Sequence, residues 1–79
     1  MPAYLATFHT HCDALIFMRL LQSLDILGKL APVPRSLSSS CGVCARFQTE
    51  GSLEPFREAE IERLLRQEDK NYVLLIDKR

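Results

Sequence analysis

The stretch "KLAPVPRSLSSSCGVCARFQ" (residues 29–48) decides the order of the secondary structure. Two apolar runs, 29–34 and 43–48, flank a polar segment that is rich in serine. The second run alternates between apolar and other side chains, which is typical of a strand. The prolines of the first run confine it to the edge of a sheet or end it. Two neighbouring strands are therefore predicted, joined by a loop that carries Cys41.

The "CGVC" motif within this stretch raises the question of a redox pair. If the segment from Gly42 to Cys44 is extended, the Cα atoms of Cys41 and Cys44 lie about 10 Å apart. A disulfide joins Cα atoms that are less than about 7 Å apart. The strand context therefore disagrees with the motif, and Cys44 as a second redox thiol remains an alternative. In the strand, one face carries Cys44 and Arg46 and the other carries Val43, Ala45 and Phe47.

Further elements extend outward from this stretch. On the N-terminal side, the sequence predicts a strand over 3–8 and a helix over 10–28. On the C-terminal side, it predicts a helix over 55–69 and a strand over 71–77. The order β-α-β-β-α-β indicates a single α+β domain, 1–79. The favoured arrangement is ferredoxin-like, an antiparallel four-stranded sheet with two helices on one face.

The first helix has clear signals at both ends. Thr10 is a natural N-cap residue, Asp13 follows three positions later, and Gly28 is expected to end the helix. Ile16 and Leu20 lie beside the main apolar stripe and widen it. They indicate either deeper burial of the helix or a homodimer contact through it. A sheet edge is the alternative location for such a homodimer contact.

The second helix is expected to bury one face and expose the other. A proline at position 55 suits its first turn. The predicted inward residues are Phe56, Ile61, Leu64 and Leu65. The pairs Glu60/Arg63 and Glu62/Arg66 are expected along the solvated side.

Composition and charge exclude several classes of function. The chain has 79 residues with ten basic and ten acidic side chains, so its formal net charge is zero. Such a chain has no strong field to attract nucleic acid or an anionic membrane. Its longest apolar run, "ALIFM", is far shorter than the about 20 residues of a membrane span, and its start lacks the features of a signal peptide. We therefore expect a cytoplasmic protein whose three cysteines stay reduced.

The predicted topology brings two distant segments together. The turn before the first helix and the loop before 43–48 lie at the same end of the sheet, so 8–12 and 38–42 approach each other. The start of the helix offers free N–H groups and the positive end of its dipole. A thiol in such surroundings has a lowered pKa, which makes Cys41 the candidate reactive residue. The expected binding residues are His9, Thr10, His11, Arg35, Ser38, Ser39, Ser40 and Gly42, with Arg46 as a further anion contact.

The same end of the sheet also offers side chains of the types that bind zinc. These are His9, His11, Cys12, Cys41 and Cys44. Their spacing matches no standard zinc motif. The site is therefore expected to work without a metal or another cofactor, and zinc remains an alternative.

The stretches "YLATFHTHCDAL" (4–15) and "APVPRSLSSSCGVCARF" (31–47) resemble the small bacterial and archaeal family described as "Putative Se/S carrier protein-like". The resemblance runs over most of the chain. This sequence departs from the family at Cys44, where a small or aliphatic residue is more common, and at Met18, where an acidic residue is expected. The most specific matching residues are Pro32, Val33, Pro34, Arg35, Leu37, Ser38, Cys41, Gly42, Arg46 and Phe47, with Thr10 and Ala14 near the first helix.

The resemblance implies that Cys41 carries selenium or sulfur, as a persulfide or selenosulfide, between donor and acceptor proteins. It implies a transfer module rather than an enzyme that acts on a free small substrate. Two other classes remain open. One is a small dimeric regulatory or interaction domain with incidental thiols, and the other is a thiol–disulfide protein that uses Cys41 and Cys44.

Overall fold

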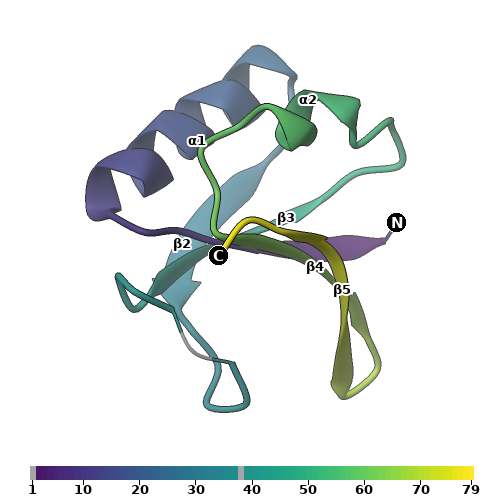
Figure 1. Ribbon diagram of the computed structural model, residues 1–79. Coiled ribbons are helices and arrows are strands. Elements are labelled where there is room, and N and C mark those ends of the chain that lie inside the picture. Colours follow the sequence, from purple (N-terminus) through teal and green to yellow (C-terminus); the bar gives the residue numbers. More distant parts are fainter. Residues whose placement is uncertain (1, 38) are drawn as a thin grey trace.

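The computed structural model describes residues 2–37 and 39–79, which form a five-stranded antiparallel sheet with two helices on one face (Figure 1). The strand order across the sheet is β2-β3-β1-β4-β5, so β1 is central and β2 and β5 are the edges. No helix in this described part is long and apolar enough to cross a membrane. Along the chain the elements are β1 (Ala3–Thr7), α1 (His11–Ser23), β2 (Gly28–Pro32), β3 (Val43–Gln48), α2 (Glu54–Arg57), β4 (Arg63–Glu68) and β5 (Asn71–Asp77).

The first half of the chain folds largely as the sequence predicts. Thr10 caps α1, since its side-chain oxygen accepts a hydrogen bond from the Asp13 N–H at 3.1 Å. The helix ends earlier than predicted, because the chain turns through Asp25, whose φ of 58° is left-handed. Gly28 begins β2 instead. A Cβ at Gly28 would lie 2.5 Å from Leu21 Cδ1, so this glycine allows α1 to pack closely against the sheet.

The predicted helix over 55–69 is wrong. Only Glu54–Arg57 is helical, a single turn, and Arg63–Glu68 forms β4. Helix-forming residues dominate this segment, but pairing with β1 on one side and β5 on the other overrides their local preference. Asp69, with a φ of 52°, turns the chain directly from β4 into β5.

The sheet therefore has five strands rather than four, and the ferredoxin-like arrangement is not confirmed. The segment 71–77 is a strand with the predicted bounds. It pairs with β4 at the edge of the sheet, because 63–68 occupies the position beside β1. What the structure supports is an α+β domain with two helices and an antiparallel sheet.

Burial in the β4 segment follows the geometry of a strand. Leu64 and Leu65 are both buried, as predicted, but they point to opposite faces of the sheet and belong to different clusters. The solvated helix face predicted for Glu62 and Arg63 does not exist. Glu62 is 5% exposed and Arg63 is 7% exposed.

Hydrophobic side chains cover both faces of the sheet. On the helix face, the rings of Phe17, Phe47 and Phe56 contact one another with centroids 5.1 to 5.6 Å apart. On the opposite face, Leu5, Cys44 and Leu65 form a second cluster. The residues that pack against this second cluster are Ala31, Val33, Leu37 and Tyr72. The β2–β3 loop therefore packs against the sheet through two of its own side chains, Val33 and Leu37.

Candidate functional site

The β2–β3 loop, which carries Cys41, is closed at its neck. The Val33 N–H donates to the Gly42 C=O at 3.2 Å, and the Leu37 N–H closes a turn by donating to the Pro34 C=O at 3.0 Å. Gly42 has a φ of 74°, and no atom outside Gly42 and its two chain neighbours lies within 4 Å of the place where its Cβ would stand. The backbone conformation, rather than the available space, therefore favours glycine here. Gly42 turns the chain into β3 directly after Cys41.

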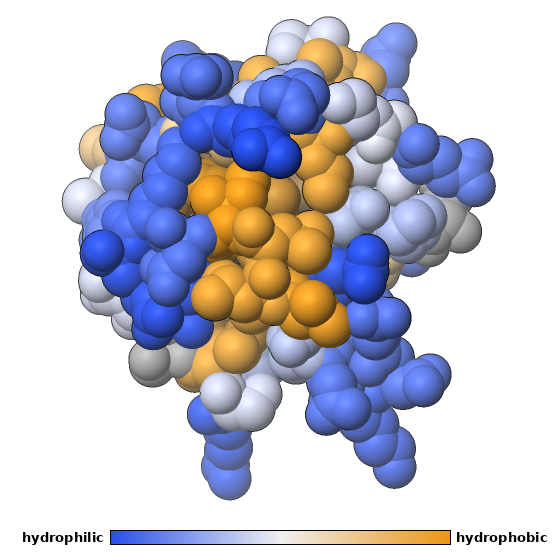
Figure 2. Space-filling model, turned by 45° about the vertical axis from the view of Figure 1, so that its right-hand side comes forward, coloured by the Kyte–Doolittle hydropathy of each residue, from blue (hydrophilic) through white to orange (hydrophobic). Residues whose placement is uncertain are grey.

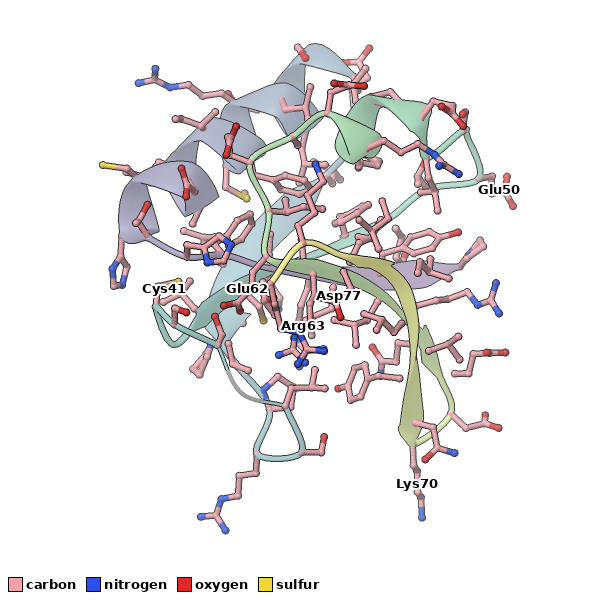
Figure 3. The ribbon with its side chains drawn as sticks, viewed as in Figure 1. Cys41, Glu50, Glu62, Arg63, Lys70 and Asp77 are labelled. Carbon is pink, nitrogen blue, oxygen red and sulfur yellow. The ribbon has the colours of Figure 1, made fainter. Side chains whose placement is uncertain are left out.

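Two serine side chains fix this loop to the end of the sheet. Ser39 Oγ donates to the Phe8 C=O at 3.1 Å, just after β1. Ser40 Oγ donates to Glu62 Oε2 at 2.8 Å, just before β4. The turn before α1 and the β2–β3 loop thus meet at one end of the sheet. Figure 3 shows Cys41 and Glu62 at this end.

Glu62 is the residue of this site that the sequence interpretation missed. Its Oε2 also lies 3.6 Å from Nδ1 of His9, which is exposed. Burial raises the pKa of Glu62, but the hydroxyls of Ser40 and Thr7, the nearby His9 and the Ser40 backbone together lower it below its usual value. The site therefore holds a buried carboxylate in its charged form. Glu62 Oε1 and Thr7 Oγ1 are buried without a well-aligned hydrogen-bond partner in the described residues.

Cys41 itself lies between core and solvent. Its side chain is partly exposed and packs against the edge of the helix-face cluster. The thiol donates to the Val43 C=O at 3.4 Å, a contact that holds it against the start of β3. The surroundings can therefore hold one accessible sulfur atom in a fixed place, directly after two serines, Ser39 and Ser40, whose hydroxyls are bonded to the body of the domain.

A family model described as "Putative Se/S carrier protein-like" matches residues 3–73. The chain belongs to this family. The match covers β1 to β4 and the first part of β5, and it includes the whole loop that carries Cys41. No curated protein and no solved structure matches the chain.

In this Se/S carrier-like protein, the second cysteine of the CGVC motif has different surroundings from the first. Cys44 is fully buried in the cluster on the face opposite the helices, where its thiol contacts the Pro32 C=O at 3.7 Å. Burial raises the pKa of the Cys44 thiol, Arg46 lowers it in part, and Cys41 raises it further. Cys41 and Cys44 are both free cysteines.

The start of α1 contributes fewer contacts to the site around Cys41 than the sequence predicts. Only His9 of this segment has a side-chain contact to the site, through Glu62. The Thr10 side chain is engaged as the helix cap. His11 and Cys12 are exposed in the first turn of α1.

The predicted basic residues do not gather at Cys41. Arg46 lies on the face of β3 that carries Cys44, and Arg35 is exposed in the loop turn with no hydrogen bond or ion pair to a described residue. Ser38 lies outside the described residues. Within residues 2–37 and 39–79, no group of three or more His, Cys, Asp or Glu side chains is arranged to hold a metal ion.

Proposed function

We propose that this protein carries sulfane sulfur or selenium on Cys41, as a persulfide or selenosulfide, from a donor protein to an acceptor protein in the cytoplasm. The observation that carries the proposal is the position of Cys41, an accessible thiol on a loop that two serine side chains fix to the sheet. Membership of the Se/S carrier-like family supports the choice of cargo.

The transfer needs no oxidant, because the sulfane atom keeps its oxidation state. The Cys41 thiol gives its proton to solvent, and the thiolate attacks the outer sulfur of a donor persulfide. The S–S bond of the donor breaks, the donor leaves as a thiolate, and a new S–S bond forms on Cys41. The acceptor thiolate then repeats the same exchange at Cys41. With selenium as cargo, the bond that forms is S–Se.

The residues around Cys41 have separate roles in this proposal. Ser39 and Ser40 hold the loop, and Gly42 sets its exit into β3. His9, His11 and Arg35 are exposed and available to a docked donor or acceptor.

The test is the intact mass of the protein after incubation with a cysteine desulfurase and cysteine, followed by removal of both. We expect the wild type to gain one sulfur atom and Cys41→Ser to gain none. Cys12→Ser is the matched control, because Cys12 is an exposed thiol on the same chain. Loss of the gain in Cys12→Ser, with retention in Cys41→Ser, would mark an unspecific reaction of the more exposed thiol and refute the proposal.

The second candidate function is a dimeric regulatory or interaction domain. The observation that favours it is the exposure of two adjacent apolar residues on α1, Leu15 at 59% and Ile16 at 57%. Exposed apolar patches of this kind often mark contact surfaces. Sulfur loading separates the two candidates, since an incidental thiol gives no selective gain at Cys41.

A further inference from the structure

β5 is an edge strand that exposes three apolar side chains in succession. Val73, Leu74 and Leu75 are 37%, 45% and 38% exposed. Figure 2 shows a continuous hydrophobic patch, bordered by hydrophilic side chains, on the side of the molecule where β5 lies. Among the described residues, no strand pairs with the outer side of β5. Its outward N–H and C=O groups are therefore available to another strand.

The opposite edge of the sheet is better protected against such pairing. β2 has five residues, among them Lys29 and Pro32, and both residue types discourage edge pairing. β5 ends in Asp77, but the five residues between its terminal Asn71 and Asp77 include neither a charged residue nor a proline. Its pairing with β4 is regular from Asn71 to Leu74, and an irregularity follows at Leu75. Apart from this irregularity, the edge between the two terminal residues of β5 is uncharged and free of proline.

We propose that β5 of one copy pairs antiparallel with β5 of a second copy, which joins the two sheets across a two-fold axis. Antiparallel pairing places the start of one β5 beside the end of the other. The three residues before β5, Glu68, Asp69 and Lys70, hold two acids and one base, whereas Asp77, Lys78 and Arg79 hold one acid and two bases. A second copy therefore brings opposite net charges together at both ends of the paired strands.

Two further features fit a second copy as the occupant. The zero net charge of the chain gives no overall repulsion between copies. The contact also leaves Cys41 open, because β1 and β4 lie between β5 and β3, the strand that follows the Cys41 loop. The inference is independent of the proposed transfer of sulfur or selenium.

Sedimentation equilibrium over a range of protein concentrations tests the pairing. We expect a reversible dimer for the wild type and a dissociation constant at least about tenfold higher for Leu75→Lys, which brings like charges together at the interface. The matched control is Leu30→Lys in the other edge strand, since Leu30 is 40% exposed and Leu75 is 38% exposed. A monomeric wild type, or equal weakening by both variants, would overturn the proposal.

Charge exchange gives a second test that does not require a change in the apolar patch. Glu68→Lys makes the start of β5 net positive, and Arg79→Glu makes its end net negative. Each variant alone should dimerise more weakly than the wild type, and a mixture of the two should form heterodimers in native mass spectrometry. A mixture that assembles no better than either variant contradicts the antiparallel arrangement.

Discussion

Ser40 Oγ donates a 2.8 Å hydrogen bond to Glu62 Oε2, and 22 residues of sequence separate the two. The Glu62 backbone is itself fixed on both sides, because its N–H donates to the Thr7 C=O at 2.7 Å and its C=O accepts from the Lys78 N–H at 2.8 Å. A buried carboxylate on such a backbone is a firm attachment point. The position of Cys41 therefore depends on an acid that is distant in sequence and adjacent in the fold.

The first prediction concerns this attachment. Ser40→Ala removes a donor from a buried carboxylate, so we expect the free energy of unfolding to fall by about 1–3 kcal/mol. Cys41 should also be alkylated faster, because its loop loses one of two side-chain ties to the sheet. Denaturant titration and the rate of iodoacetamide labelling measure the two effects. Ser36→Ala is the control, since Ser36 is exposed in the same loop, and an equal effect there would count against the attachment.

The second prediction concerns stability at acid pH. The pKa of Glu62 is lowered in the folded protein, so the unfolded chain binds this proton more readily. The stabilisation by Glu62 is therefore present above its unfolded pKa and is lost as the pH falls through the folded pKa. We expect Glu62→Gln to flatten the decline in the free energy of unfolding below about pH 5.

Asp77 provides the control for this experiment. Hydrogen bonds from Arg79 lower the pKa of Asp77 to about 2, but the carboxylate is on the surface. Salt screens a contact of this kind, whereas the buried Glu62 is much less affected. In high salt, Asp77→Asn should therefore leave the decline in the free energy of unfolding at acid pH unchanged, while Glu62→Gln still flattens this decline. The reverse result would show that Glu62 does not control the loss of stability at acid pH.

The third prediction concerns the three thiols. In the folded protein, Cys12 and Cys41 should react with a thiol reagent, and Cys44 should not. Cys44 is fully buried and burial raises its pKa, so little thiolate is present or accessible. Its labelling should appear only with unfolding, which peptide mass mapping at increasing denaturant can follow. Labelling of Cys44 at the rate of Cys41 in native buffer would contradict the burial.

The fourth prediction concerns the short α2. Phe56 is fully buried between Phe17 and Phe47, so Phe56→Ala should lower the free energy of unfolding by about 3–5 kcal/mol. That is a large share of the stability of a small domain. Pro55→Ala in the same turn changes an exposed residue and should have little effect. Thermal unfolding of both variants gives the comparison. A small loss of stability in Phe56→Ala would mean that α2 adds little to the core.

Sequence reasoning was successful where local pattern and tertiary environment agree. Thr10 has the side chain of a cap and acts as one, and the alternation over 43–48 corresponds to a strand with two differently packed faces. The approach of the serine loop to the start of α1 followed from chain direction alone, and the Ser39 contact to Phe8 confirms that approach.

It failed where long-range pairing overrides local preference. The segment before Asp69 is rich in helix-forming residues. It forms a strand because it pairs with β1, a long-range contact that local sequence does not reveal. The local signal for a hairpin was weak, because Asp69 and Lys70 do not form one of the glycine-containing dipeptides that are typical of a two-residue turn. With the segment taken as a helix, Glu62 was assigned to a solvated face, and its contact with Ser40 was not foreseen.

The packing of the two thiols of the CGVC motif on opposite faces of the sheet would have a chemical consequence for a carrier. Cys41 packs with the helix-face cluster and Cys44 with the cluster on the opposite face. A neighbouring thiol that reached a persulfide would attack its inner sulfur, release the cargo as hydrogen sulfide and leave an internal disulfide. Cys44 is fully buried. In the proposed carrier role, this burial would prevent the internal reaction, so release of the cargo would depend on the acceptor thiol.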